Sequence, residues 1–252
     1  MPYWKPINTT YLYDGTLEGL FTIVFDSFVT HTIPSNIILQ SHYVFNLLDH
    51  PITITSNFSK FQRIYTGILK NISYDTLYNS YYSFLSESSD REMEILQYLY
   101  HGFMVGPSIN TMLSIPYVFR VNALRKKVLG EAHRLKGLVR FLEVGENLYY
   151  ASIHPDHNVL ELVGHHFTKR LSGQNFVIHD KNRNIAFFFD TKQYQIVDAS
   201  NLVVPPISEK EEYYQSLWKV FFKTIAIPER TNKKCQMQYM PKKYWNDLVE
   251  NP

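Results

Sequence analysis

The residues best suited to chemistry lie between positions 131 and 170 of the 252-residue chain. Glu131, His133 and Lys136 share one predicted helix, and His166 and Arg170 share a later one. Carboxylates and imidazoles transfer protons at neutral pH, whereas guanidinium and ammonium groups bind phosphate. We therefore take this stretch as the working surface of a protein that handles nucleic acid.

Four residues in and near this stretch are candidates for catalysis. In a hydrolase, Glu131 or Asp180 would act as the general base, and His133 or His166 as the general acid. The helical period places Glu131 and His133 on opposite flanks of a buried stripe. The alternative is that these side chains only border the core, as charged residues at a helix edge commonly do.

His166 and Arg170 are four residues apart, so they are neighbours on one helical face. The planar guanidinium offers a fork of donors and the imidazole adds another, which suits a phosphate or an acidic substrate group. The alternative is an internal ion pair of Arg170 with Asp180 or Glu131 that ties the helix to a hairpin.

Basic residues supply the candidates for nucleic-acid binding. The set comprises Arg134, Lys136, Arg140, Arg170, Arg230 and Lys234. The last two lie in a tail where basic residues alternate with aromatic ones, a pattern that suits a single-stranded or flipped-out nucleotide. The alternative for the tail is a short helix docked by Tyr244 and Trp245.

We expect no metal and no cofactor. The segment His154-Pro155-Asp156-His157 and the pair His165-His166 are rich in histidine but lack the His-Glu-x-x-His spacing of zinc hydrolases. The single cysteine, Cys235, excludes an intrachain disulfide and an iron–sulfur cluster held by this chain alone. Glycine-rich phosphate loops, a Ser-His-Asp order and deaminase motifs are also absent from the sequence.

Charge divides the chain into two parts. Residues 1–119 hold 5 Lys and Arg against 9 Asp and Glu, whereas residues 120–252 hold 20 against 14. We predict an acidic, mainly helical first part and a basic α+β second part that carries the site, the alternative being one continuous domain. The basic part either faces an anionic partner or is a solvated face.

The longest apolar run near the N-terminus, residues 20–29, is broken by Asp26. It is far shorter than the ~20 residues that cross a bilayer, and no basic region precedes it as in a signal peptide. We expect a cytoplasmic protein without membrane association.

The first part is predicted to be a helical bundle with a short N-terminal strand. Residues 11–15 indicate a strand and an Asp-Gly turn, with Asp14 capping a helix from Leu17. Residues 30–56 indicate a long connection with one strand near positions 37–39. Residues 56–129 carry apolar stripes at helical spacing, one of them behind a capping box from Ser89 to Glu92.

The second part is predicted to be an antiparallel β-β-α-β-β sheet covered by helices, which makes the fold class α+β. Hairpins at 138–153 and 176–190 flank a helix at 156–171, and residues 193–197 add a strand. An amphipathic helix begins after Ser208. We place its Trp218 in the core, so that Trp218→Ala would cost about 3 to 5 kcal/mol.

Several segments carry a family resemblance. They include Tyr13-Asp14-Gly15, Glu131-Ala132-His133-Arg134, Lys136-Gly137, Val139-Arg140-Phe141, His166-Phe167, Leu217-Trp218-Lys219, Glu229-Arg230, Met240-Pro241 and Tyr244-Trp245. With them the chain resembles, over essentially its whole length, a bacterial family of uncharacterised proteins described as probable DNA metabolism proteins. The resemblance implies a link to DNA repair and to a radical SAM protein of DNA repair or modification. Relatives can be fused to a uracil-DNA glycosylase-like domain, which would then be a further partner.

Three hypotheses for function follow. The first is an accessory protein that binds DNA, single-stranded or damaged, and acts with the radical SAM partner, because this chain lacks the three cysteines of that cluster. The second is a stand-alone nucleic-acid hydrolase, either a nuclease or a glycosylase-like enzyme. The third is a structural interaction module whose basic half binds an acidic protein.

Overall fold

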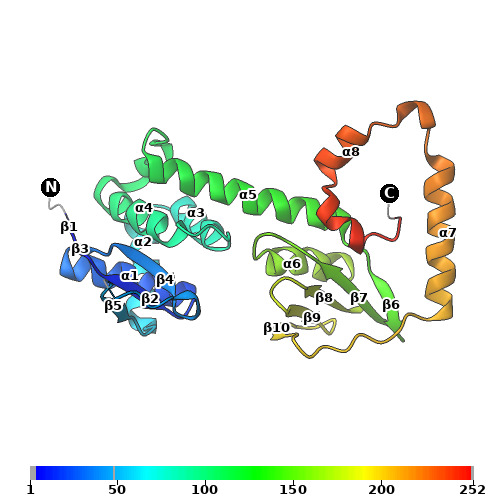
Figure 1. The fold of residues 1–252 in the computed structure, drawn as a ribbon, viewed down its shortest axis with the longest axis horizontal. Helices are drawn as coiled ribbons and strands as arrows, with labels where there is room; N and C mark the ends of the chain where they lie inside the picture. Colours follow the sequence, from blue (N-terminus) through cyan, green and yellow to red (C-terminus); the bar gives the residue numbers. More distant parts are fainter. Residues whose placement is uncertain (1–3, 48, 251–252) are drawn as a thin grey trace. The chain divides into compact units, whose positions relative to one another are not determined.

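The computed structural model describes residues 4–47 and 49–250 (Figure 1). The chain divides into two compact units, Met1–Val128 and Leu129–Pro252, and the boundary falls within the helix α5 (Pro116–Leu138). Both units combine helices with strands, so the fold is mixed α+β. Within the described residues, every helix is too short or too polar to cross a membrane.

Unit 1 contains two small sheets of parallel strands. The larger has the order β4-β2-β5, and in the smaller β1 pairs with β3. The strands are β1 (Lys5–Pro6), β2 (Thr10–Tyr13), β3 (Thr32–Ile33), β4 (Asn36–Leu39) and β5 (Pro51–Thr53). The predicted strand near position 37 is confirmed. The predicted helical bundle with a short N-terminal strand did not include these two sheets, because strands of two to four residues are too short to show an alternating pattern.

The helices of unit 1 share one apolar core. They are α1 (Leu17–Thr30), α2 (Phe58–Asn71), α3 (Tyr74–Phe84), α4 (Arg91–Val105), the 3-10 helix η2 (Gly106–Thr111) and the first part of α5. The 3-10 helix η1 (Gln40–His42) has no buried residue. Thr16, not Asp14, caps α1, since the Thr16 side chain accepts the backbone N–H of Gly19. The predicted capping box at Ser89 is wrong, because α4 begins after Asp90 without a side-chain cap.

Unit 2 is built on a five-stranded sheet with the order β10-β9-β8-β7-β6. The strands are β6 (Leu142–Gly145), β7 (Leu148–Ile153), β8 (Asn175–Asp180), β9 (Ile185–Phe189) and β10 (Tyr194–Asp198). Both predicted hairpins are confirmed, but β7 and β8 run parallel, so the prediction of a wholly antiparallel sheet is wrong at its centre. Helix α6 (Leu160–Arg170) joins these two strands, and a crossing helix returns the chain to the edge from which the previous strand started.

Helix α6 packs on one face of this sheet at a point where glycine is required. Gly164 faces the ring of Phe187, and no space is left for a Cβ atom. The ring of Phe187 is itself fixed, because its centroid lies 4.8 Å from that of Tyr194 in a stacked pair. A side chain at position 164 therefore cannot be accommodated by turning this ring aside.

The C-terminal segment departs most from the sequence-based expectation. Helix α7 (Glu209–Ile225) has the predicted N-cap, since Ser208 Oγ accepts the Glu211 N–H at 3.1 Å, but none of its residues, all of them described, is buried. Trp218 is 40% exposed and donates from Nε1 to Glu250 at 3.1 Å. Trp218 is therefore not a core residue, and the large cost expected for its truncation loses its basis. The segment ends with η3 (Pro228–Arg230), α8 (Lys233–Tyr239) and η4 (Lys242–Asp247).

We predict that Gly164→Ala destabilises unit 2 by about 1–3 kcal/mol, because the added methyl overpacks the contact between α6 and Phe187. Urea unfolding followed by circular dichroism measures the change. Gly137→Ala is the matched control, since nothing lies within 4 Å of a Cβ there and alanine favours a helix by up to about 1 kcal/mol. Equal unfolding midpoints for the two variants would contradict the packing described.

Candidate functional site

Polar side chains gather where the parallel strands β7 and β8 end. In sheets with parallel strands, ligands bind beyond the carboxyl ends of those strands. Strand β7 leads into residues 154–157, and β8 ends at Asp180. Helix η4 adds Lys243 and Asp247 from the far end of the sequence. This end of the sheet is the candidate site.

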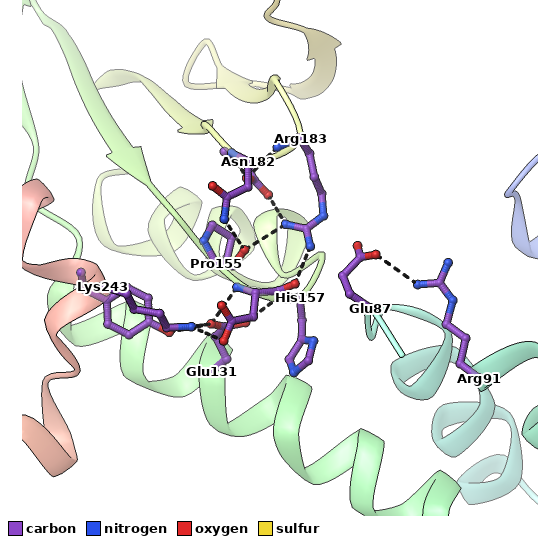
Figure 2. A network of polar contacts seen from close by, with 11 residues as sticks. Glu87, Arg91, Glu131, Pro155, His157, Asn182, Arg183 and Lys243 are labelled. Carbon is purple, nitrogen blue, oxygen red and sulfur yellow. Dashed lines mark hydrogen bonds and ion pairs between the residues drawn. The ribbon is translucent and has the colours of Figure 1, made fainter. Parts of the chain in front are cut away.

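The carboxylate of Glu131, on α5, is the centre of the network (Figure 2). It accepts the Lys243 ammonium at 2.6 Å and the Tyr244 hydroxyl at 2.6 Å. It also accepts the backbone N–H groups of Asp156 at 3.0 Å and His157 at 2.8 Å. Because Glu131 is only 1% exposed, one buried carboxylate ties α5 to the loop after β7 and to η4.

These bonds decide the protonation of Glu131. Burial by itself raises the pKa of the carboxyl, but the bonds from Lys243, from Tyr244 and from the loop N–H groups outweigh it and lower the pKa to about 2. The same contact with Glu131 adds to burial in raising the pKa of Tyr244 to about 12. A carboxylate that is held ionised by four donors is a weak base, so the geometry favours a structural role for Glu131.

Asp180 anchors the same loop from the other side. Its carboxylate accepts Arg183 Nη1 at 2.9 Å and the backbone N–H groups of Asn182 and Arg183. Arg183 in turn donates to the carbonyl of Pro155 at 3.2 Å and to that of Asp156 at 2.7 Å, and Asn182 Nδ2 donates to Pro155 at 2.9 Å (Figure 2). Burial raises the pKa of Asp180, and Arg183 opposes this shift.

The loop after β7 is therefore held through its backbone on both sides. Glu131 binds its N–H groups, whereas Arg183 and Asn182 bind its carbonyl groups. Helix α6 begins at Leu160 and not at the predicted residue 156, and the carbonyl groups of Pro155 and Asp156 bind side chains instead of helix N–H groups. The loop fixes the position of His154 at its start.

His154 belongs to a second polar cluster, which sequence reasoning did not find. Asp247 accepts His154 Nδ1 at 2.9 Å and Ser152 Oγ at 2.7 Å. His179 lies on β8 opposite Ser152, and its Nδ1 is 3.1 Å from the hydroxyl of Tyr150. The available signal was Tyr150, Ser152 and His154 at alternate positions of one strand. Asp247 carried no such signal, since it is 93 residues from His154.

His166 and Arg170 lie one turn apart on α6, as the sequence predicted. Burial, and then the charges of Lys136 and Arg170, lower the pKa of His166, so Lys136 on α5 acts on the same imidazole. Among the described residues, neither Lys136 nor Arg170 has a hydrogen-bonded or ion-paired partner. The alternative of an internal pair is wrong, since Asp180 pairs with Arg183 and Glu131 with Lys243. We call these three residues the basic cluster.

The other candidates lie apart from these groups. His133 is exposed, two residues from Glu131 on α5 and therefore on a different face. Arg140 pairs with Glu250 at 2.6 Å and also donates to two carbonyl groups, so its charge is neutralised within the protein. Arg134 is half-buried, and Arg230 and Lys234 are exposed. Within the described residues, no group of three or more His, Cys, Asp or Glu side chains is arranged to hold a metal ion.

Comparison with known proteins identifies one family. Residues 89–250 match the family model described as a domain of unknown function, DUF4130. The matched residues begin just before α4 and include every helix and strand of unit 2. No curated protein and no solved structure matches the chain.

We predict that Glu131→Gln lowers the stability of the protein at pH 7 by about 3 kcal/mol and flattens its dependence on acid pH. The folded carboxyl has a pKa of about 2 against an ordinary value of 4.5. Its contribution is therefore complete above pH ~4.5 and is lost as the pH falls towards 2, at about 1.4 kcal/mol per pH unit.

Urea unfolding of the wild type and the variant between pH 7 and pH 2.5 measures this difference. Glu146→Gln, an exposed glutamate in the same unit, is the control and should follow the wild type at every pH. A constant gap between wild type and Glu131→Gln across this range would show that the buried charge is not what stabilises the contact.

Proposed function

The chain belongs to the family of this domain of unknown function, and we propose that its second unit binds the phosphates of nucleic acid through the basic cluster. The observation that carries the proposal is that the charges of Lys136 and Arg170 both act on His166, while neither cation pairs with a carboxylate among the described residues. Like charges held close repel, and a bound phosphate removes that repulsion.

The chemistry of the three side chains supports phosphate as the ligand. Arg170 is exposed and presents its planar fork to solvent, and Lys136 adds a point charge. A nearby anion favours the protonated form of His166, so a bound phosphate would raise its lowered pKa. The protonated imidazole would then be a third hydrogen-bond donor to the phosphate. Phosphate contacts of this kind carry affinity without reading sequence.

The resemblance to the DNA metabolism family supports DNA, single-stranded or damaged, as the nucleic acid. We extend the proposal accordingly to a cytoplasmic accessory protein that acts in DNA repair together with a radical SAM protein or a uracil-DNA glycosylase-like protein. The single cysteine agrees with the role of companion, because the cluster has to come from another chain.

The exposed face of α7 supports the further proposal that unit 2 binds another protein. Large apolar side chains of this helix remain 40% or more exposed, among them Leu217, Trp218, Val220, Phe221 and Ile225. Leu217, Trp218 and Phe221 line a groove of about 880 Å³ between α7, Phe141 and Tyr149. Contiguous apolar surface of this kind marks sites of protein association, so the third hypothesis, an interaction module, is compatible with the first.

We predict that Arg170→Ala weakens binding of labelled single-stranded DNA about tenfold in low salt, and that Arg170→Lys weakens it less because charge remains while the fork is lost. Fluorescence anisotropy across a salt series measures both affinity and phosphate contacts. Loss of one contact should reduce the slope of log affinity against log salt by about 0.7.

Thermal melting should be unchanged in both variants, because Arg170 is exposed and has no partner among the described residues. Lys192→Ala removes another exposed cation of unit 2 and serves as the control for net charge. Wild-type affinity and slope in Arg170→Ala, or a large drop in melting temperature, would defeat the proposed function.

A further inference from the structure

His154 is oriented like the base of a catalytic dyad. Its Nδ1 lies 2.9 Å from Asp247, whose other oxygen accepts Ser152 Oγ at 2.7 Å. The Asp247 side chain is 9% exposed, whereas that of His154 is 38% exposed. A carboxylate that binds Nδ1–H leaves the lone pair of the neutral ring on Nε2 of this partly exposed side chain.

The position of His154 is fixed from both directions along the chain. Strand β7 ends at Ile153, immediately before it, and the carbonyl of Pro155, immediately after it, is bound by Asn182 and Arg183. Asp247 is held by Ser152 at the same time. A base held by packed strands and satisfied hydrogen bonds does not have to be ordered when a substrate binds.

The neighbour of this dyad is a buried histidine with an unused nitrogen. His179 is 2% exposed, and its Nε2 is buried without a hydrogen-bond partner among the described residues. Burial, then the charges of Lys181 and His154, lower its pKa. When the Tyr150 hydroxyl donates to Nδ1, the proton of His179 is on the buried Nε2.

The charges around the dyad indicate an anionic substrate. The charges of Lys181 and His154 both act on His179, and Asp247 already has both oxygens occupied. Buried polar atoms without partners are rare in folded proteins, and those that occur are commonly completed by a ligand or water. The oxygens of a phosphoryl group accept hydrogen bonds from ammonium groups, so its charge suits the exposed Lys181.

We propose that His154, oriented by Asp247, is the general base of a phosphodiesterase site at the carboxyl ends of β7 and β8. Its Nε2 takes a proton from water, the water oxygen bonds to phosphorus, and the bond from phosphorus to the leaving ester oxygen breaks. The leaving oxygen takes the proton back from His154. The ammonium of Lys181 offsets the negative charge of the phosphoryl oxygens. The choice of a phosphodiester rests on the proposed function, in which the chain binds nucleic acid.

The test uses the full chain and two probes, the chromogenic diester bis(p-nitrophenyl) phosphate and labelled single-stranded DNA. Hydrolysis of the chromogenic diester should fall at least about a hundredfold in His154→Ala and return in part when imidazole is added. Asp247→Asn should fall at least about tenfold, and His42→Ala, an exposed histidine of unit 1, should match the wild type. Rescue by imidazole separates loss of the base from loss of the fold.

The outcomes also separate this inference from the proposed function. If the wild type binds DNA in the manner that depends on Arg170 but hydrolyses neither probe, the dyad is not catalytic and the binding function stands. Hydrolysis that survives in His154→Ala at the wild-type rate overturns the inference as well. Hydrolysis of the chromogenic diester that depends on His154, without any binding of DNA, supports the dyad and removes the proposed function.

Discussion

A buried carboxylate holds unit 2 together. Burying the Glu131 carboxylate without partners would cost several kcal/mol of hydration free energy. Four donors from two distant segments replace the water that it loses. Lys243 and Tyr244 are 112 and 113 residues away in the sequence, so this one group decides where the C-terminal segment lies. Once η4 is bound there, Asp247 reaches the end of β7 and Glu250 reaches Arg140.

This constraint sorts the charged residues into two kinds. The first kind is paired inside the protein, and removing one partner would destabilise the fold; it comprises Glu131, Asp180, Arg140 and Arg183. The second kind comprises the basic cluster, which has no ion-paired partner among the described residues, and the partly exposed His154. Ligand binding and proton transfer need side chains that are held in place but still have a donor or acceptor atom available. These residues meet that condition, so the proposed roles are assigned to them.

Helix α7 shows what amphipathicity alone does not decide. Its apolar residues follow a helical period and its Ser208 cap forms as expected, because both are local properties of the sequence. Whether an apolar stripe is buried depends on what else is present to cover it. Here the helix contacts the rest of unit 2 mainly along one groove and through Trp218 with Glu250, and its other apolar side chains remain exposed.

The sequence by itself determined the local elements: the helix from Leu17, the hairpins on either side of α6, and the proximity of His166 to Arg170 one turn apart. These follow from periodicity, turn residues and helix geometry within a few positions. Tertiary structure alone decided that β7 and β8 are parallel, that Glu131 and Asp180 are structural anchors, and that Asp247 orients His154. The physical reason is distance along the chain, since pairings between residues 93 or 112 positions apart leave no period in either segment and exist only after the sheet has formed. Asp180 pairs with the nearby Arg183, but its role as an anchor depends on the contact of Arg183 with Pro155, 28 residues away.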